Sequence, residues 1–119
     1  MSRTRALIGA VVVVVVFILA GGILIYANRG SGGEDVTISV TVTKASVMTP
    51  SELKAHQNDR VTFSVTSDTD GEVHLHGYDI HFDTKAGQTV TQKFTADKTG
   101  DFPIEWESTS TELGHFVVT

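Results

Sequence analysis

The stretch Val36-Thr37-Ile38-Ser39-Val40-Thr41-Val42-Thr43 alternates apolar and small hydroxyl residues without interruption. Successive side chains of a β-strand point to opposite faces of the sheet, so the four apolar side chains fall on one face and the hydroxyls on the other. The pattern therefore predicts a strand with one face against a core and the other toward solvent.

Similar strand patterns follow toward the C-terminus, separated by turn sequences such as Asn58-Asp59 and Asp97-Lys98-Thr99-Gly100. Further strands are expected at 61–66, 89–94, 102–106 and 113–118. The stretch 72–81 is also expected to be extended, with a bend or bulge at Gly77, and Ile80 and Phe82 continue its apolar face. The segment Met48–Leu53 contains Pro50 and fits either one helical turn or an edge strand. Roughly seven short strands without helical periodicity predict an all-β fold, an antiparallel sandwich or barrel.

The apolar faces of these strands predict the core. The residues expected between two sheets are Val61, Phe63, Val65, Val73, Leu75, Phe94, Phe102, Ile104 and Val117. The globular part, residues 36–119 of the 119, has room for one small domain.

On the N-terminal side of the first strand the chain changes character. Residues 6–27 contain no charged side chain, and a helix of about 20 such residues spans the hydrocarbon core of a bilayer. Arg3 and Arg5 precede this run. The positive-inside rule therefore predicts a cytoplasmic N-terminus at 1–5, a single transmembrane helix at 6–27 and an extracytoplasmic domain at the cell membrane.

A cleaved signal peptide is the competing interpretation of this run. Ile25-Tyr26-Ala27 is a poor small-x-small cleavage site and the run is longer than a usual signal sequence, which favours an uncleaved signal anchor. Residues 28–35 begin with Asn-Arg-Gly-Ser-Gly-Gly and predict a flexible linker.

All fourteen acidic residues lie at or after Glu34, together with six of the nine basic ones. This net acidic domain does not favour nucleic acid as a partner, because phosphate backbones attract basic surfaces. The membrane, through the anchor, and other envelope proteins are the partners to consider. Cysteine is absent, which excludes disulfides, a lipoprotein anchor and thiolate metal sites.

Three of the five histidines lie in the stretch Glu72-Val73-His74-Leu75-His76-Gly77-Tyr78-Asp79-Ile80-His81. In a strand, His74 and His76 point to the same face, and two imidazoles so spaced can bind one Cu(II) or Zn(II). The alternative is a solvated strand face that carries histidines. Neutral imidazole is the ligand, so metal affinity should fall below a pH of about 6.5.

The order of these pieces resembles the cupredoxin-like fold, the Greek-key β-sandwich of small blue copper proteins and of the copper domain of cytochrome oxidase subunit II. The resemblance covers residues 36–119. It is carried by the segments Asp70–Asp79, Ala86-Gly87-Gln88, Phe94–Glu105 and Leu113–Val118. It implies a Greek-key sandwich and places His76 near the first histidine ligand of the family.

The resemblance does not extend to the copper ligands. Trp106 stands about where copper cupredoxins have a cysteine, and the following loop, Glu107–Glu112, has neither histidine nor methionine. A blue copper centre needs the thiolate, so its electron-transfer role is not expected. Glu107 and Glu112 fall where the missing ligands would be. The candidate metal ligands are therefore His74, His76, Glu107 and Glu112, with copper as Cu(II) preferred over zinc.

The remaining polar residues fit ordinary roles. His56, His81 and His115 are expected at the surface, and Asp79 is suited either to a turn or to orienting a histidine ligand. No catalytic motif is visible, so no enzyme is predicted. Two functions remain: an extracytoplasmic module that binds copper, or a structural or protein-interaction sandwich that has lost the metal.

Overall fold

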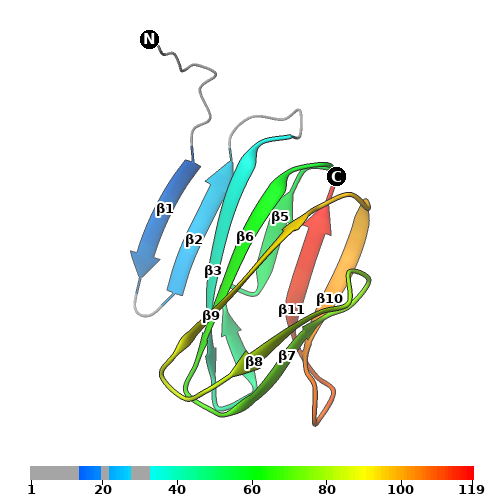
Figure 1. Cartoon of the computed structure of the whole chain (residues 1–119). Coiled ribbons are helices and arrows are strands. Elements are labelled where there is room, and N and C mark those ends of the chain that lie inside the picture. Colours follow the sequence, from blue (N-terminus) through cyan, green and yellow to red (C-terminus); the bar gives the residue numbers. More distant parts are fainter. Residues whose placement is uncertain (1–13, 20–21, 28–32) are drawn as a thin grey trace.

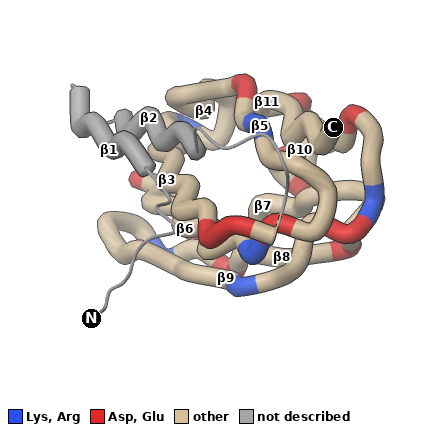
Figure 2. The backbone as a smooth tube through the Cα atoms, turned by 90° about the horizontal axis from the view of Figure 1, so that it is seen from above, with Lys and Arg blue, Asp and Glu red and all other residues tan. Residues whose placement is uncertain are grey.

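The computed structural model describes residues 14–19, 22–27 and 33–119, and no helix occurs in these ranges. Two sheets form the two layers of a β-sandwich (Figures 1 and 2). The first has the order β4 (Val47–Thr49), β3 (Asp35–Thr43), β6 (Arg60–Ser67), β9 (Thr89–Thr95). The second has the order β5 (Glu52–Ala55), β11 (Thr111–Val118), β10 (Gly100–Trp106), β7 (Gly71–Leu75), β8 (Ile80–Thr84).

The segment around Pro50 forms edge strands. β4 pairs with β3 in one sheet, and β5 pairs in parallel with β11 in the other, so the chain changes sheets at Pro50 and Ser51. Proline lacks a backbone N–H and suits a break between edge strands better than the interior of a sheet. Of the two alternatives for Met48–Leu53, the edge strand is the one observed.

The core lies between the inward faces of the two sheets. The strand that begins the sandwich, β3, runs parallel to β6, and their apolar residues are in register, with Val36 opposite Val61 and Ile38 opposite Phe63. Phe63 contacts Phe82 and Phe116 across the core, with ring centroids 5.1 and 6.3 Å apart. The predicted core residues that are fully buried are Val61, Phe63, Val65, Val73, Leu75 and Ile104. Phe94 and Phe102 are partly buried and pack against this core.

The prediction for Val117 was wrong. Val117 is only half-buried, and its neighbours Phe116 and Val118 fill the core instead. The register between β10 and β11 shifts by one residue between Ile104 and Glu105, so β11 contains a bulge. A one-residue shift moves every later side chain of a strand to the opposite face of the sheet. Counting alternate residues from Leu113 therefore assigns Val117 to the core, although the bulge turns it outward.

The run predicted as a transmembrane helix, residues 6–27, differs in its described parts. Val14–Leu19 (β1) and Gly22–Ala27 (β2) form an antiparallel pair. Valine and isoleucine favour strands in water, whereas the predicted helix would be imposed by lipid, which cannot solvate open strand edges. Among the described residues, no helix is long and apolar enough to cross a membrane. The rest of the run lies outside the described residues, and the anchor remains a prediction.

Candidate metal centre

The candidate site is built on the β7–β8 hairpin, where Leu75 pairs with Ile80 across a four-residue turn. Gly77 and Asp79 in this turn adopt positive φ angles of 83° and 54°. A Cβ atom at Gly77 would lie 2.2 Å from Phe102 Cδ1, so only glycine fits beneath the turn. The turn therefore rests on a half-buried aromatic side chain, Phe102.

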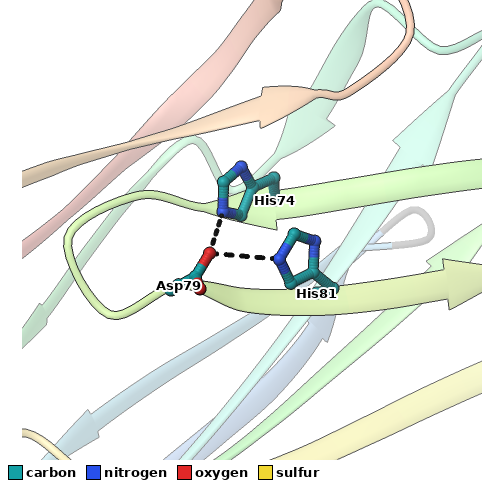
Figure 3. Close-up of side chains that lie close together, drawn as sticks. All are labelled: His74, Asp79 and His81. Carbon is teal, nitrogen blue, oxygen red and sulfur yellow. Dashed lines mark hydrogen bonds and ion pairs between the residues drawn. The ribbon is translucent and has the colours of Figure 1, made fainter.

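Three side chains of the hairpin converge on its outer face: His74, Asp79 and His81 (Figure 3). His74 and His81 are directly opposite each other on β7 and β8, and their rings stack with centroids 4.2 Å apart. Both Nε2 atoms donate hydrogen bonds to the same oxygen, Asp79 Oδ1, at 3.0 and 3.1 Å. One ligand atom from each of the three residues lies within 4.8 Å of the others, a spacing from which they could hold one metal ion.

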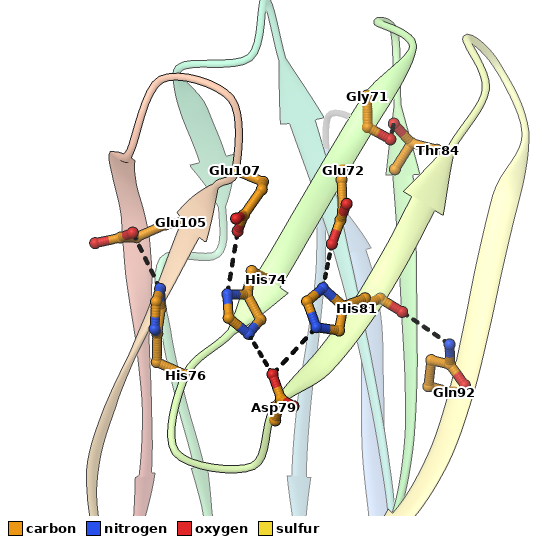
Figure 4. Close-up of polar contacts among 10 residues, drawn as sticks. All are labelled: Gly71, Glu72, His74, His76, Asp79, His81, Thr84, Gln92, Glu105 and Glu107. Carbon is orange, nitrogen blue, oxygen red and sulfur yellow. Dashed lines mark hydrogen bonds and ion pairs between the residues drawn. The ribbon is translucent and has the colours of Figure 1, made fainter.

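Each imidazole has a second carboxylate near its other nitrogen (Figure 4). His81 Nδ1 donates a hydrogen bond to Glu72. His74 Nδ1 lies 3.1 Å from Glu107 Oε1, close enough for an ion pair, but the groups are not oriented for a hydrogen bond, and this buried nitrogen has no hydrogen-bond partner. Buried polar atoms are usually satisfied, so an unpaired ring nitrogen within a histidine cluster is unusual.

His76 lies beside this cluster. Its ring centroid is 4.2 Å from that of His74, as the same-face prediction required, but its Nε2 donates to Glu105 at 3.0 Å. Glu105 is the residue of β10 directly opposite His74. The structure thus brings His74, His76 and Glu107 into one neighbourhood, with His76 paired to its own carboxylate.

Glu112, the fourth predicted ligand, lies on β11 opposite Glu105, one strand further from the hairpin than Glu105 itself. Its carboxylate accepts a hydrogen bond of 2.6 Å from His115 Nε2, and Asp101 accepts one of the same length from His115 Nδ1. Among the described residues, the group of three side chains that could hold a metal ion is His74, Asp79 and His81, and it does not include Glu112. The structure therefore does not bring Glu112 together with His74.

The charge of the cluster follows from its contacts. Hydrogen bonds from His74 and His81 lower the pKa of Asp79 below its usual range, so this carboxylate stays ionised. The hydrogen bond to Glu72, helped by Asp79, raises the pKa of His81. A metal ion that binds His81 Nε2 has to displace a proton from this nitrogen. Because the pKa of His81 is raised, protons compete with the metal ion at a higher pH than they would at a free histidine.

A blue copper centre does not fit this chain. Trp106, where the resemblance placed the cysteine, is a core residue with 3% of its surface exposed. Its ring lies so close to the backbone of Gly71 that a Cβ there would be 2.2 Å from Trp106 Cζ2. The end of the sandwich is filled by packing at this point. Imidazole and carboxylate donors on the outer face instead match a tetragonal Cu(II) or tetrahedral Zn(II) site.

Sequence reasoning missed His81 as a partner of His74. It placed His81 correctly on an exposed position, but paired His74 with the residue two positions along the same strand. The hairpin register would have identified this partner. Because Leu75 pairs with Ile80, His74 before Leu75 must lie opposite His81 after Ile80. Directly opposed residues have Cβ atoms about 4.5–5.5 Å apart, closer than residues two apart on one strand.

No protein-family model matches the sequence, and no curated protein matches it. Solved structures match by fold. A heme-copper terminal oxidase has a TM-score of 0.64 and 15% identity, over 74% of this chain and 66% of the oxidase chain. The metal-binding domain of the Streptococcus pneumoniae Cu(I)-exporting P-type ATPase CopA, solved with Cu(I), has a TM-score of 0.63 and 12% identity, over 77% and 91%. A copper binding protein in its apo form has a TM-score of 0.58 and 16% identity, over 76% and 93%.

These similarities confirm the predicted resemblance at the level of fold: the sandwich is cupredoxin-like. The chain spans about two thirds of the length of the oxidase chain that it matches, at 66%. At identities between 12% and 16%, the similarity establishes the architecture and leaves the ligands to be argued from this chain's own residues.

Proposed function

We propose that this protein is a copper-binding module that holds one Cu(II) ion through His74, Asp79 and His81 on the outer face of the β7–β8 hairpin. The observation that carries the proposal is the convergence of both Nε2 atoms on Asp79 Oδ1, at 3.0 and 3.1 Å. A metal ion placed there would replace two N–H protons by two N–metal bonds, without moving either strand.

Copper is preferred over zinc for two reasons. Divalent copper has the highest affinity of the divalent first-row metals for nitrogen and oxygen donors. Two of the solved structures with this fold are described as binding copper, one as a copper binding protein and one with Cu(I). Without a thiolate, the expected site is a storage or transfer site and not a blue copper electron carrier. Binding, with no catalysed reaction, is the activity proposed.

The proposed setting is the outer face of the cell membrane. It rests on the uncharged run 6–27, on the arginines before it, and on the charge asymmetry of the chain. One of the similar folds is part of a Cu(I)-exporting ATPase, which is consistent with copper handling at a membrane. Other envelope proteins are the partners to which such a module would pass its ion.

The proposal is tested by titrating the purified full-length chain with Cu(II) in a calorimeter. The wild type should bind one ion, and the double variant His74→Ala with His81→Ala should lose that site. A matched control, His56→Ala with His115→Ala, removes two histidines from other positions and should bind as the wild type does. Binding that is unchanged in the first variant, or absent from the wild type, would favour the structural or protein-interaction role.

A further inference from the structure

The inference concerns the two glutamates behind the histidines and rests on the proposed function. Glu72 and Glu107 lie at the Nδ1 atoms of His81 and His74, on the side of each ring away from Asp79 (Figure 4). We propose that they are positioning residues, each of which holds a proton on Nδ1 so that Nε2 is free to bind the metal.

The argument starts from the chemistry of imidazole. A neutral ring has one N–H and one lone pair, and only the nitrogen with the lone pair can bind a metal. The tautomer is therefore set by what the other nitrogen touches, and metal-bound histidines usually donate that N–H to a carboxylate or a carbonyl. A carboxylate at Nδ1 selects the tautomer that binds through Nε2.

At His81 this arrangement is already formed. Its Nδ1 donates to Glu72, and its Nε2 points to Asp79. Glu72 lies on β7 and is directly opposite Asp83 on β8, two pairs along the hairpin from the His74–His81 pair and therefore on the same face. When the metal displaces the proton of Nε2, the hydrogen bond to Glu72 stays in place and keeps the ring in its present orientation.

At His74 the arrangement is prepared but incomplete. Its Nε2 faces Asp79 Oδ1 at 3.0 Å, and its buried Nδ1 has no hydrogen bond. Binding through Nε2 requires the ring proton to be on Nδ1, where Glu107 Oε1 is 3.1 Å away. Glu107, predicted from the sequence as a metal ligand, is thus assigned to the far side of the ring, as the acceptor that appears when the ion binds.

The test compares Glu72→Gln and Glu107→Gln with Glu105→Gln in the full-length chain, using Cu(II) and Zn(II) as probes. The control removes the same charge from the same face, at the residue that pairs with His76. We expect the first two variants to bind Cu(II) about 10–100-fold more weakly, the usual loss for an outer carboxylate. The control should change the affinity by less than about twofold, because Glu105 is hydrogen-bonded to His76, which is not one of the proposed ligands.

Two spectroscopic readouts distinguish positioning from ligation. In the Zn(II)-loaded wild type, long-range proton–nitrogen correlation spectra should show Nδ1–H and metal-bound Nε2 for both histidines. The Cu(II) EPR spectrum should keep its ligand set in both glutamine variants. Three outcomes would overturn the inference while leaving the proposed function standing. They are a changed ligand set in Glu107→Gln, Cu(II) affinities equal to that of the wild type in both glutamine variants, and an equal loss of affinity in the control Glu105→Gln. Binding unaffected by His74→Ala with His81→Ala would overturn both.

Discussion

At the scale of single residues, His115 shows how neighbouring carboxylates raise the pKa of a histidine on this acidic surface. Its two nitrogens donate to Asp101 and Glu112 on the outer face of β10 and β11, and these hydrogen bonds, Asp101 first, raise its pKa above 6.5. The folded state therefore holds the proton more tightly than the unfolded chain does. This contribution to stability is complete below the unfolded pKa and is lost as the pH rises through the folded pKa.

An NMR titration of the His115 ring protons measures this directly. The midpoint should lie above 6.5 in the wild type and move down toward 6.5 in Asp101→Asn, since the variant removes the strongest acceptor. Asp83→Asn, an exposed carboxylate on β8, serves as the control and should leave the midpoint in place. A midpoint at or below 6.5 in the wild type would show that the two carboxylates do not bind the ring in solution.

The site shows how far single residues can be predicted. His74 was identified because the alternation of a strand is a local rule, and the same rule placed His76 beside it. His81 and the acceptors Glu72 and Glu107 could not be assigned, because their positions depend on turn length and on which strands are neighbours. Glu105 becomes a neighbour of His74 only because β10 pairs with β7, a contact between residues about thirty positions apart in the sequence.

At the scale of elements, the sandwich is held together where strands of both sheets meet at Phe63. This residue of β6 is fully buried and contacts Phe82 of β8 and Phe116 of β11. Phe63→Ala should lower the free energy of unfolding by about 3–5 kcal/mol, since a large ring leaves a packed core. Urea unfolding, followed by the fluorescence of the single tryptophan, Trp106, measures this change.

Val47→Ala is the matched control for that experiment. Val47 lies on the edge strand β4 with 57% of its surface exposed, and its truncation should change stability by less than about 0.5 kcal/mol. A loss of under about 1 kcal/mol for Phe63→Ala would mean that the two sheets do not meet at this residue.

The elements were more predictable than their details. Strands β3, β6, β9 and β10 lie close to the ranges expected, because alternation and turn residues are local signals. The bulge in β11 was not expected, since nothing in Leu113–Val118 alone shows that the register to β10 shifts. Packing between strands decides it, with Leu113 and Gly114 both buried.

At the scale of the whole molecule, the predicted topology places the sandwich outside the cytoplasm. Protease added to intact spheroplasts should remove the domain and leave a short membrane-bound fragment that contains residues 6–27. Cells made permeable before digestion provide the control for protease access. Complete protection of the domain in intact spheroplasts would reverse the orientation, and a domain released without protease would indicate a cleaved signal sequence.

The central claim is that copper binds between two strands, at His74 and His81. Pulsed EPR of the Cu(II)-loaded full-length chain tests this claim most directly, because it detects the remote nitrogens of coordinated imidazoles. The account predicts two equatorial imidazoles, weak visible absorption because no thiolate is present, one imidazole in His81→Ala, and two in His76→Ala. Two imidazoles in His81→Ala together with one in His76→Ala would contradict it and would place the ion along the single strand β7.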